Sequence, residues 1–409
     1  MPVACIPVIS AEAVTTRALP DYTEAVTIIV GQGQAISISN PRGIHYLPLD
    51  TRQVLSRLIR SSAPLSLESL TRQASGYKKQ LPTPTAIMPT KLRPEFAAML
   101  EGMSKHPPLP VGDAMARRQA MDPMMAAIDK ARKAASPELD ERITLRTHLV
   151  PRPDDGHKVP VLHYALKDAE PGQPLTAGIV NVHGGGFIFG SAHFLDSGVR
   201  RHVLETGVPI FDVEYRLAPE NPYPVPHEDA WAALVWVHAH AADFGVDPKR
   251  IALMGDSAGG CIAAALALHA VTQGLEIAKL ILVCPMLDDR TGRDLSIDTS
   301  GYTWKPEDNI TAWDAVLGGA APEVKSGMIP AVTARVAELG GMPPTLLQIG
   351  GCDLFLDEGL AFGTALARQG AEVEMITYAG SPHGFEDIIP TSPASIRARQ
   401  DRCRVIRGL

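Results

Sequence analysis

The stretch at 250–261, RIALMGDSAGGC, decides the fold class of this chain. An apolar run at 250–254 leads into a turn that holds Ser257 between small residues, and an almost wholly apolar helical segment begins at Ala258. In such a strand–turn–helix the central residue adopts a strained conformation, and the glycines around it let helix and strand approach each other. We therefore expect Ser257 to project above a sheet as a nucleophile. The alternative is a serine that only caps the helix.

Short apolar runs alternate with helical patterns from about residue 140 onward, and this alternation predicts an α/β fold with a mostly parallel sheet covered by helices on both faces. The first two predicted strands have the pattern of an antiparallel edge. We expect strands at 143–150, 159–165, 178–182, 209–215, 250–254, 279–284, 344–349 and 373–378, and helices at 194–205, 227–241, 258–272 and 357–369.

A serine nucleophile needs a base that takes its proton and a carboxylate that orients this base. His383 lies in a Pro/Gly-flanked loop after the last predicted strand, and Asp353 follows the strand before it. The chain order Ser257, Asp353, His383 is the order that a hydrolase sheet of this kind imposes. Asp357 is the competing acid, although it also suits the first turn of the next helix.

Other charged residues near strand ends have simpler structural interpretations. We interpret Asp288 and Asp289 as residues that cap a loop or support a cap, and Arg216 and Glu220 as a buried ion pair or a brace for a turn. Asp256 lies at the start of a predicted helix, where a carboxylate is favoured without any catalytic duty.

The sequence HGGGF at 183–187 directly follows the predicted strand 178–182. Attack on an acyl group creates an oxyanion that needs N–H donors, and consecutive glycines offer amides that no side chain blocks. We therefore expect Gly185, Gly186 and Ala258 to supply an oxyanion hole. A phosphate-binding loop is the rival interpretation, but no Gly-Lys-Ser/Thr follows. We interpret His183 as a hydrogen-bonding brace of this loop.

Five motifs together resemble the bacterial hormone-sensitive-lipase-like esterases, family IV of the lipolytic enzymes. They are HGGGF at 183–187, EYRLAPE at 214–220, GDSAGG at 255–260, DLFLDE at 353–358 and HGF at 383–385. The resemblance implies an α/β-hydrolase fold with a helical cap, a triad of Ser257, Asp353 and His383, and metal-independent hydrolysis of short to medium acyl esters. A homodimer is expected on the same ground. The family commonly has Asp-Pro-Leu at the acid, whereas this chain has Asp-Leu-Phe.

The resemblance supplies nothing for residues 1–88, which we take as an N-terminal extension of unknown role. For the remainder it implies that 89–135 form the N-terminal part of the cap and 136–409 the catalytic domain, with a second cap segment at 286–330. In that segment Tyr302, Trp304 and Trp313 are candidate walls of an acyl pocket, with ordinary cap packing as the alternative.

Two amphipathic helices are expected within 92–135. Phe96 and Leu100 belong to the apolar face of the first, and the second is expected to begin at Asp122, with Pro123 at its first position. In the N-terminal extension, a hairpin at 25–39 and helices at 51–60 and 66–73 fit the pattern. The string GQGQAI at 31–36 lacks the third glycine of a dinucleotide-binding motif.

Composition limits the classes of protein that the chain can belong to. A net charge of −7 and no cluster of Lys and Arg exclude a nucleic-acid binder. The cysteines, Cys5, Cys261, Cys284, Cys352 and Cys403, are scattered and predict neither a disulfide framework nor a zinc site. No apolar stretch reaches the roughly 18 residues that span a bilayer, and no secretory signal begins the chain. We therefore expect a cytoplasmic protein without metal, cofactor or stable membrane insertion.

The leading hypothesis is a serine carboxylesterase that acts on a small-molecule ester through an acyl-enzyme. An amidase or acyl transferase on the same triad is the runner-up, because the sequence indicates the nucleophile more firmly than the leaving group. A binding module on a retired hydrolase scaffold is a third hypothesis, and it predicts that a triad member is missing.

Overall fold

The computed structural model describes residues 91–409 except 104–108, 153, 168–173, 195, 296–300 and 319–328, together with the backbone of three strands nearer the N-terminus. The chain divides into two compact units, Met1–Ala86 and Ile87–Leu409. In the first unit, β1 (Thr27–Ile29) pairs antiparallel with β2 (Ile36–Asn40), which confirms the predicted hairpin. The strand β3 (Gly43–Leu47) adds to it and was not predicted. The helices expected at 51–60 and 66–73 lie outside the described residues.

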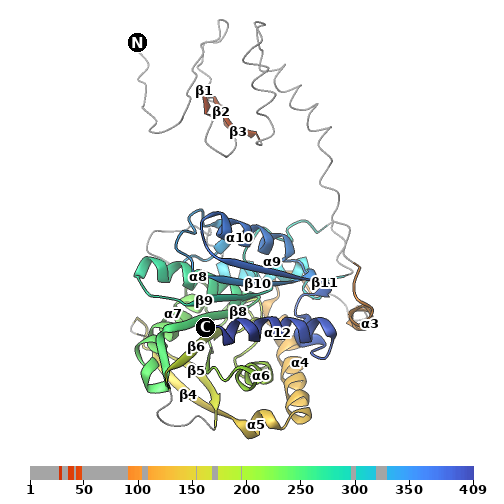
Figure 1. Cartoon of the computed structure of the whole chain (residues 1–409). Coiled ribbons are helices and arrows are strands. Elements are labelled where there is room, and N and C mark those ends of the chain that lie inside the picture. The colour runs from red at the N-terminus through yellow and green to blue at the C-terminus, as the bar shows by residue number, and fades with distance from the viewer. Residues whose placement is uncertain are drawn as a thin grey trace, which may run out of the picture. The chain divides into compact units, whose positions relative to one another are not determined.

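The second unit is built on an eight-stranded sheet in the order β11-β10-β9-β8-β6-β7-β5-β4 (Figure 1). β5 pairs antiparallel with β4 and with β7, whereas the other neighbours are parallel, so the predicted antiparallel edge is confirmed. All eight predicted strands are present, as β4 (Ile143–Pro151), β5 (Lys158–Leu166), β6 (Thr176–Val182), β7 (Ile210–Val213), β8 (Val246–Asp256), β9 (Lys279–Val283), β10 (Thr345–Cys352) and β11 (Val373–Pro382).

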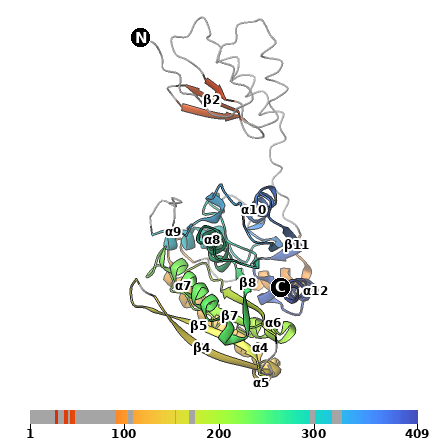
Figure 2. The same ribbon diagram turned by 60° about the vertical axis from the view of Figure 1, so that its left-hand side comes forward.

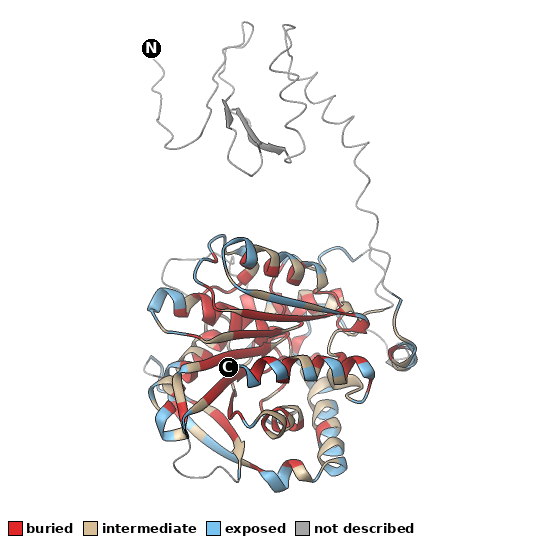
Figure 3. Cartoon of the chain, in the orientation of Figure 1, coloured by how far each residue is buried: buried red, intermediate tan, exposed pale blue. Residues whose placement is uncertain are grey.

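Helices cover both faces of this sheet, as the alternation along β8 demonstrates. Ile251 and Leu253 pack into a core with helices α7 (Val225–Ala239), α8 (Ala258–Gln273) and α10 (Leu356–Arg368). Ala252 and Met254 point the other way, into a second core with α6 (Asp196–Thr206) and α12 (Pro393–Arg407). Because successive side chains of a strand alternate between faces, the two cores lie on opposite sides. Figures 2 and 3 show the two helical layers and the buried central strands.

Three further helices lie before the first strand of the sheet or between β9 and β10 in the chain order. They are α3 (Pro94–Met103) and α4 (Ala114–Ala135), which precede the sheet, and α9 (Pro306–Leu317), within the expected second cap segment. α4 and α9 are tied by buried Arg117, whose Nε donates to Asp308 at 2.8 Å. Phe96 of α3 packs edge-on against Phe385, with ring centroids 6.2 Å apart. Short helices α5 (Glu138–Arg142) and α11 (Phe385–Ile388) complete the described helices.

The expected start of the second N-terminal helix is wrong. α4 begins at Ala114, where the side chain of Asp113 accepts a hydrogen bond from the Ala116 amide, and Pro123 lies inside the helix. A proline in the first turn loses no hydrogen bond, so an Asp-Pro pair has the pattern of a helix start. Here Asp122 instead accepts a hydrogen bond from the Gly190 amide, 2.9 Å away. In the described part of the chain, no helix is both long and apolar enough to cross a membrane.

Candidate active site

Ser257 occupies a tight turn between β8 and α8, as predicted. Its backbone has φ +52° and ψ −118°, a conformation that non-glycine residues rarely adopt. The turn depends on its glycines: a Cβ at Gly255 would lie 2.3 Å from the carbonyl oxygen of Gly259, and one at Gly259 would lie 2.0 Å from that of Val182. Any side chain at these positions would push helix and strand apart and move Ser257.

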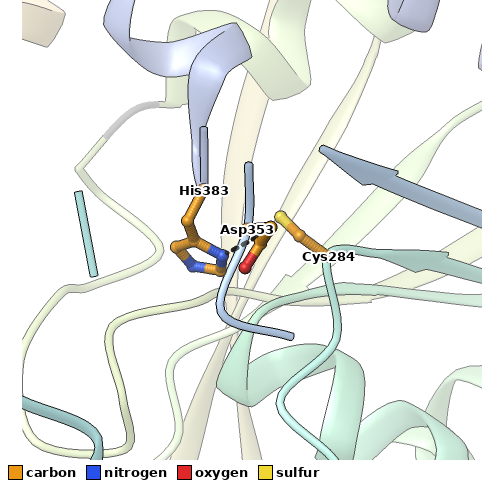
Figure 4. A group of neighbouring side chains, drawn as sticks. All are labelled: Cys284, Asp353 and His383. Carbon is orange, nitrogen blue, oxygen red and sulfur yellow. Dashed lines mark hydrogen bonds and ion pairs between the residues drawn. The ribbon is translucent and has the colours of Figure 1, made fainter. Parts of the chain in front are cut away.

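A hydrogen-bonded chain connects Ser257 to His383 and Asp353. The Oγ of Ser257 lies 3.0 Å from Nε2 of His383. On the other side of the ring, Nδ1 of His383 lies 2.8 Å from Oδ2 of Asp353, the contact drawn in Figure 4. A carboxylate only accepts, so the imidazole proton resides on Nδ1 and Nε2 is free to accept from the serine hydroxyl. The Phe355 amide donates to the second oxygen of Asp353 at 2.9 Å and holds the carboxylate in place.

The sheet topology explains why residues so distant in sequence meet. Ser257, Asp353 and His383 directly follow the carboxyl ends of β8, β10 and β11, three strands that run parallel and belong to one half of the sheet. Asp357, the competing acid, lies in the first turn of α10, and the carboxylate bonded to His383 is that of Asp353.

The environment of His383 shifts its pKa upward. Burial lowers this pKa, but the Asp353 carboxylate and, after it, the neighbouring Cys284 sulfur together outweigh burial, so that the pKa of His383 lies well above its ordinary value of 6.5. The imidazolium that forms when His383 takes a proton is therefore stabilised inside the protein.

The HGGGF loop follows β6, the sheet neighbour of β8, and turns sharply. Gly185 has φ +117° and Gly186 φ +59°. A Cβ at Gly185 would meet the Phe189 carbonyl oxygen at 1.9 Å, and one at Gly186 would meet the Trp304 ring at 2.7 Å. Only glycine fits this loop. The Ala258 amide, the other expected donor, is the first of α8 and has no acceptor within its helix.

Asp256 has a wider role than the helix-start carboxylate that the sequence indicated. It accepts a hydrogen bond from the Gly184 amide, and burial, together with the charge of Asp387, raises its pKa to about 7. A Cβ at Gly184 would lie 2.3 Å from the Asp256 carboxylate. The residue before Ser257 therefore fastens the loop that carries Gly185 and Gly186.

Helix α4 braces the same loop from outside the sheet. Arg118 donates to the Ile188 carbonyl at 2.6 Å and binds Glu220 through two nitrogens, while Asp122 accepts from the Gly190 amide. Sequence analysis missed this brace, although Arg118 and Asp122 lie four positions apart and so share one helix face. Their partners are far away in the chain.

Aromatic side chains of the 286–330 segment adjoin the site. The Trp304 ring centroid lies 6.4 Å from that of His383, and Trp313 lies 5.5 Å from Phe187 of the HGGGF loop. Both indoles are buried. Thr303, beside Trp304, donates to the His383 carbonyl at 2.6 Å. This segment therefore packs directly against His383 and the HGGGF loop.

The remaining charged residues have structural contacts. Asp288 pairs with Arg290, and Asp289 binds Arg335 through both carboxylate oxygens. Arg216 and Glu220 do not form the expected ion pair with each other. Arg216 binds buried Asp229, and Glu220 binds Arg118.

His183 braces the loop as expected. Its Nδ1 donates to the Gly184 carbonyl at 2.8 Å, and its ring stacks on Tyr215 at 4.3 Å.

Metal-ligating side chains gather at one place among the described residues. Cys284, Asp353 and His383 each offer one ligand atom, and these atoms all lie within 4.8 Å of one another. Two of the three belong to the hydrogen-bonded chain that ends at Ser257.

Comparisons with known proteins agree with this architecture. A family model described as alpha/beta hydrolase fold matches residues 179–387. Esterase LipI of Mycobacterium tuberculosis is 34% identical over 232 residues, which are 56% of this chain and 71% of the relative. Ethyl acetate hydrolase of Pseudomonas putida is 29% identical over 306 residues, 72% of this chain and 92% of the relative. The solved structure of a bacterial heroin esterase has a TM-score of 0.68 at 32% identity and covers 78% of this chain and 97% of its own.

Proposed function

This chain belongs to the alpha/beta hydrolase fold family, among its hormone-sensitive-lipase-like esterases, and from that premise we propose that it is a serine carboxylesterase acting on short- to medium-chain acyl esters. Its relatives named as esterases and ester hydrolases make the protein a carboxylic ester hydrolase by class. The observation that carries the finer proposal is the chain of hydrogen bonds of 3.0 and 2.8 Å from Ser257 through His383 to Asp353.

The reaction follows from the positions of the protons in the hydrogen bonds that join Ser257, His383 and Asp353. Nε2 of His383 takes the proton of Ser257 while Oγ bonds to the acyl carbon, and the electron pair of the carbonyl moves onto its oxygen. The amides of Gly185, Gly186 and Ala258 donate to this oxyanion. The intermediate collapses to an acyl-serine, and the alcohol leaves with the proton from Nε2. Water then repeats both steps and releases the acid.

Trp304 of the 286–330 segment lies beside His383, with its ring centroid 6.4 Å from that of His383, and we expect it to limit the length of the acyl chain. Trp313 is fully buried against Phe187 and so has the role of ordinary packing. Each methylene that enters the pocket contributes about 0.8 kcal/mol until the pocket ends. Efficiency should therefore rise over the shortest chains and fall once the pocket ends. The resemblance to the hormone-sensitive-lipase-like esterases implies the upper limit, with about C4–C8 favoured over about C16.

A panel of chromogenic esters of increasing acyl length, with an anilide matched to one of them, tests this proposal. The proposal expects a maximum at short to medium chains and slower cleavage of the anilide. A preference for the anilide would make the protein an amidase, and a steady rise to the longest esters would make it a lipase for long chains. A homodimer, expected from the resemblance, stays a prediction that sedimentation of the purified chain tests.

A further inference from the structure

A buried thiol, that of Cys284, adjoins the His383–Asp353 pair. Cys284 follows β9 directly, between the strands whose ends carry Ser257 and Asp353. Its backbone has φ +38°, unusual for a residue with a side chain, and its amide donates to the Gln348 carbonyl of β10 at 2.7 Å. Figure 4 shows its sulfur turned toward the same two side chains.

The three side chains have the chemistry of a zinc site. Thiolate, imidazole and carboxylate are its usual ligands, at about 2.0–2.3 Å from the ion, which separates them from one another by about 3–4 Å. The ligand atoms of Cys284, Asp353 and His383 all lie within 4.8 Å of one another, so small side-chain rotations bring them to these distances. A divalent ion with one thiolate and one carboxylate is neutral overall, which suits a buried position.

We propose that Cys284, Asp353 and His383 form a binding site for a thiophilic divalent cation such as Zn²⁺, and that the bound cation switches the catalytic site off. The inhibitory half of this inference rests on the proposed function, whereas the binding half does not.

Inhibition follows from the position of one proton. In the metal-free protein, Nδ1 of His383 carries the proton that it donates to Asp353, which leaves Nε2 to accept from Ser257. A cation between Nδ1 and the carboxylate takes the Nδ1 lone pair, so the imidazole proton moves to Nε2. Nε2 then donates to Ser257 and can no longer accept its proton. The thiol of Cys284 releases its own proton to solvent as the metal–sulfur bond forms.

The test uses the full chain with Co²⁺ as a spectroscopic probe and Zn²⁺ as an inhibitor. Cys284→Ser is the variant, and Cys403→Ser is its matched control, since Cys403 is also a buried free thiol but lies on α12, where its sulfur contacts Glu205. We expect a cobalt–thiolate charge-transfer band and inhibition of ester hydrolysis in the wild type and in Cys403→Ser. Cys284→Ser should lose the band, and its inhibition should require at least about tenfold more Zn²⁺.

Asp353→Asn provides a second measurement that needs no activity. If the three residues act together, its cobalt affinity should fall by about 10–100-fold, whereas an unchanged affinity would mean that the thiol binds metal alone and would overturn the proposed site. A wild type that hydrolyses esters but shows neither band nor inhibition would also overturn it. If the metal-free protein hydrolyses no ester, the proposed function is refuted. The cobalt band would still show whether Cys284, Asp353 and His383 bind a metal ion.

Discussion

The substitution Asp353→Asn isolates the part of the site that sets the tautomer of His383. In the wild type the Phe355 amide donates to one oxygen of Asp353, and the other oxygen accepts from Nδ1 of His383. Asparagine has one oxygen and one NH₂ group of nearly the same shape. The Phe355 amide needs an acceptor, so it will hold the asparagine oxygen, and the NH₂ group will face Nδ1. His383 must then accept at Nδ1 and carry its proton on Nε2.

This inverted tautomer cannot take the proton of Ser257. A wrong tautomer in a serine triad costs about 10⁴-fold in turnover, which corresponds to about 5.4 kcal/mol in activation free energy. The assay is the steady-state hydrolysis of a short-chain chromogenic ester, with circular dichroism as a check of folding. Asp357→Asn is the matched control, because Asp357 lies four residues further on, in the first turn of α10. A loss below about tenfold in Asp353→Asn, or equal losses in both variants, would refute the reasoning.

Three further predictions concern the oxyanion loop, the base and the N-terminal unit. Gly186→Ala should lower kcat by about 10²–10³-fold. The new Cβ would lie 2.7 Å from the Trp304 ring at a residue whose φ is +59°, so the loop amides must move. Steady-state kinetics on folded protein checks this, and a near-native kcat would contradict it. The rise of kcat/KM with pH should have its midpoint above about pH 6.5, since His383 must be neutral to act as a base and Asp353 raises its pKa against the effect of burial. A rate that is flat from acid to neutral pH would exclude His383 as the base. Deletion of residues 1–88 should leave a folded, active remainder, because the unit Ile87–Leu409 contains every residue of the candidate site, and insoluble protein would show that this expectation is wrong.

The sheet, and the meeting of Ser257, Asp353 and His383 at its edge, could be predicted because both depend on local patterns. Each strand is an apolar run bounded by turn residues, and Ser257, Asp353 and His383 each directly follow such a run. Since parallel strands end at one edge, three short local signals were enough to bring the residues together. The arginine-rich helix α12 has no such apolar run and was not predicted.

Contacts that cross between elements could not be read from local patterns. Asp122 before Pro123 has the pattern of a helix start, yet its partner is Gly190, and only the folded chain brings them within 2.9 Å. The same holds for Asp256, whose local interpretation at a helix start omitted Gly184. The scattered cysteines gave no sign that Cys284 lies beside Asp353 and His383, because these residues meet only where three strands end.

Labelling with a fluorophosphonate followed by mass spectrometry tests whether Ser257 forms an acyl-enzyme during ester hydrolysis. We expect one adduct per chain, located on Ser257, and a loss of ester hydrolysis in proportion to labelling. Ser257→Ala should take up no label and hydrolyse no ester above the residual level. Full labelling of Ser257 with hydrolysis intact, an adduct on another residue that abolishes activity, or near-native turnover in Ser257→Ala would contradict the acyl-enzyme mechanism.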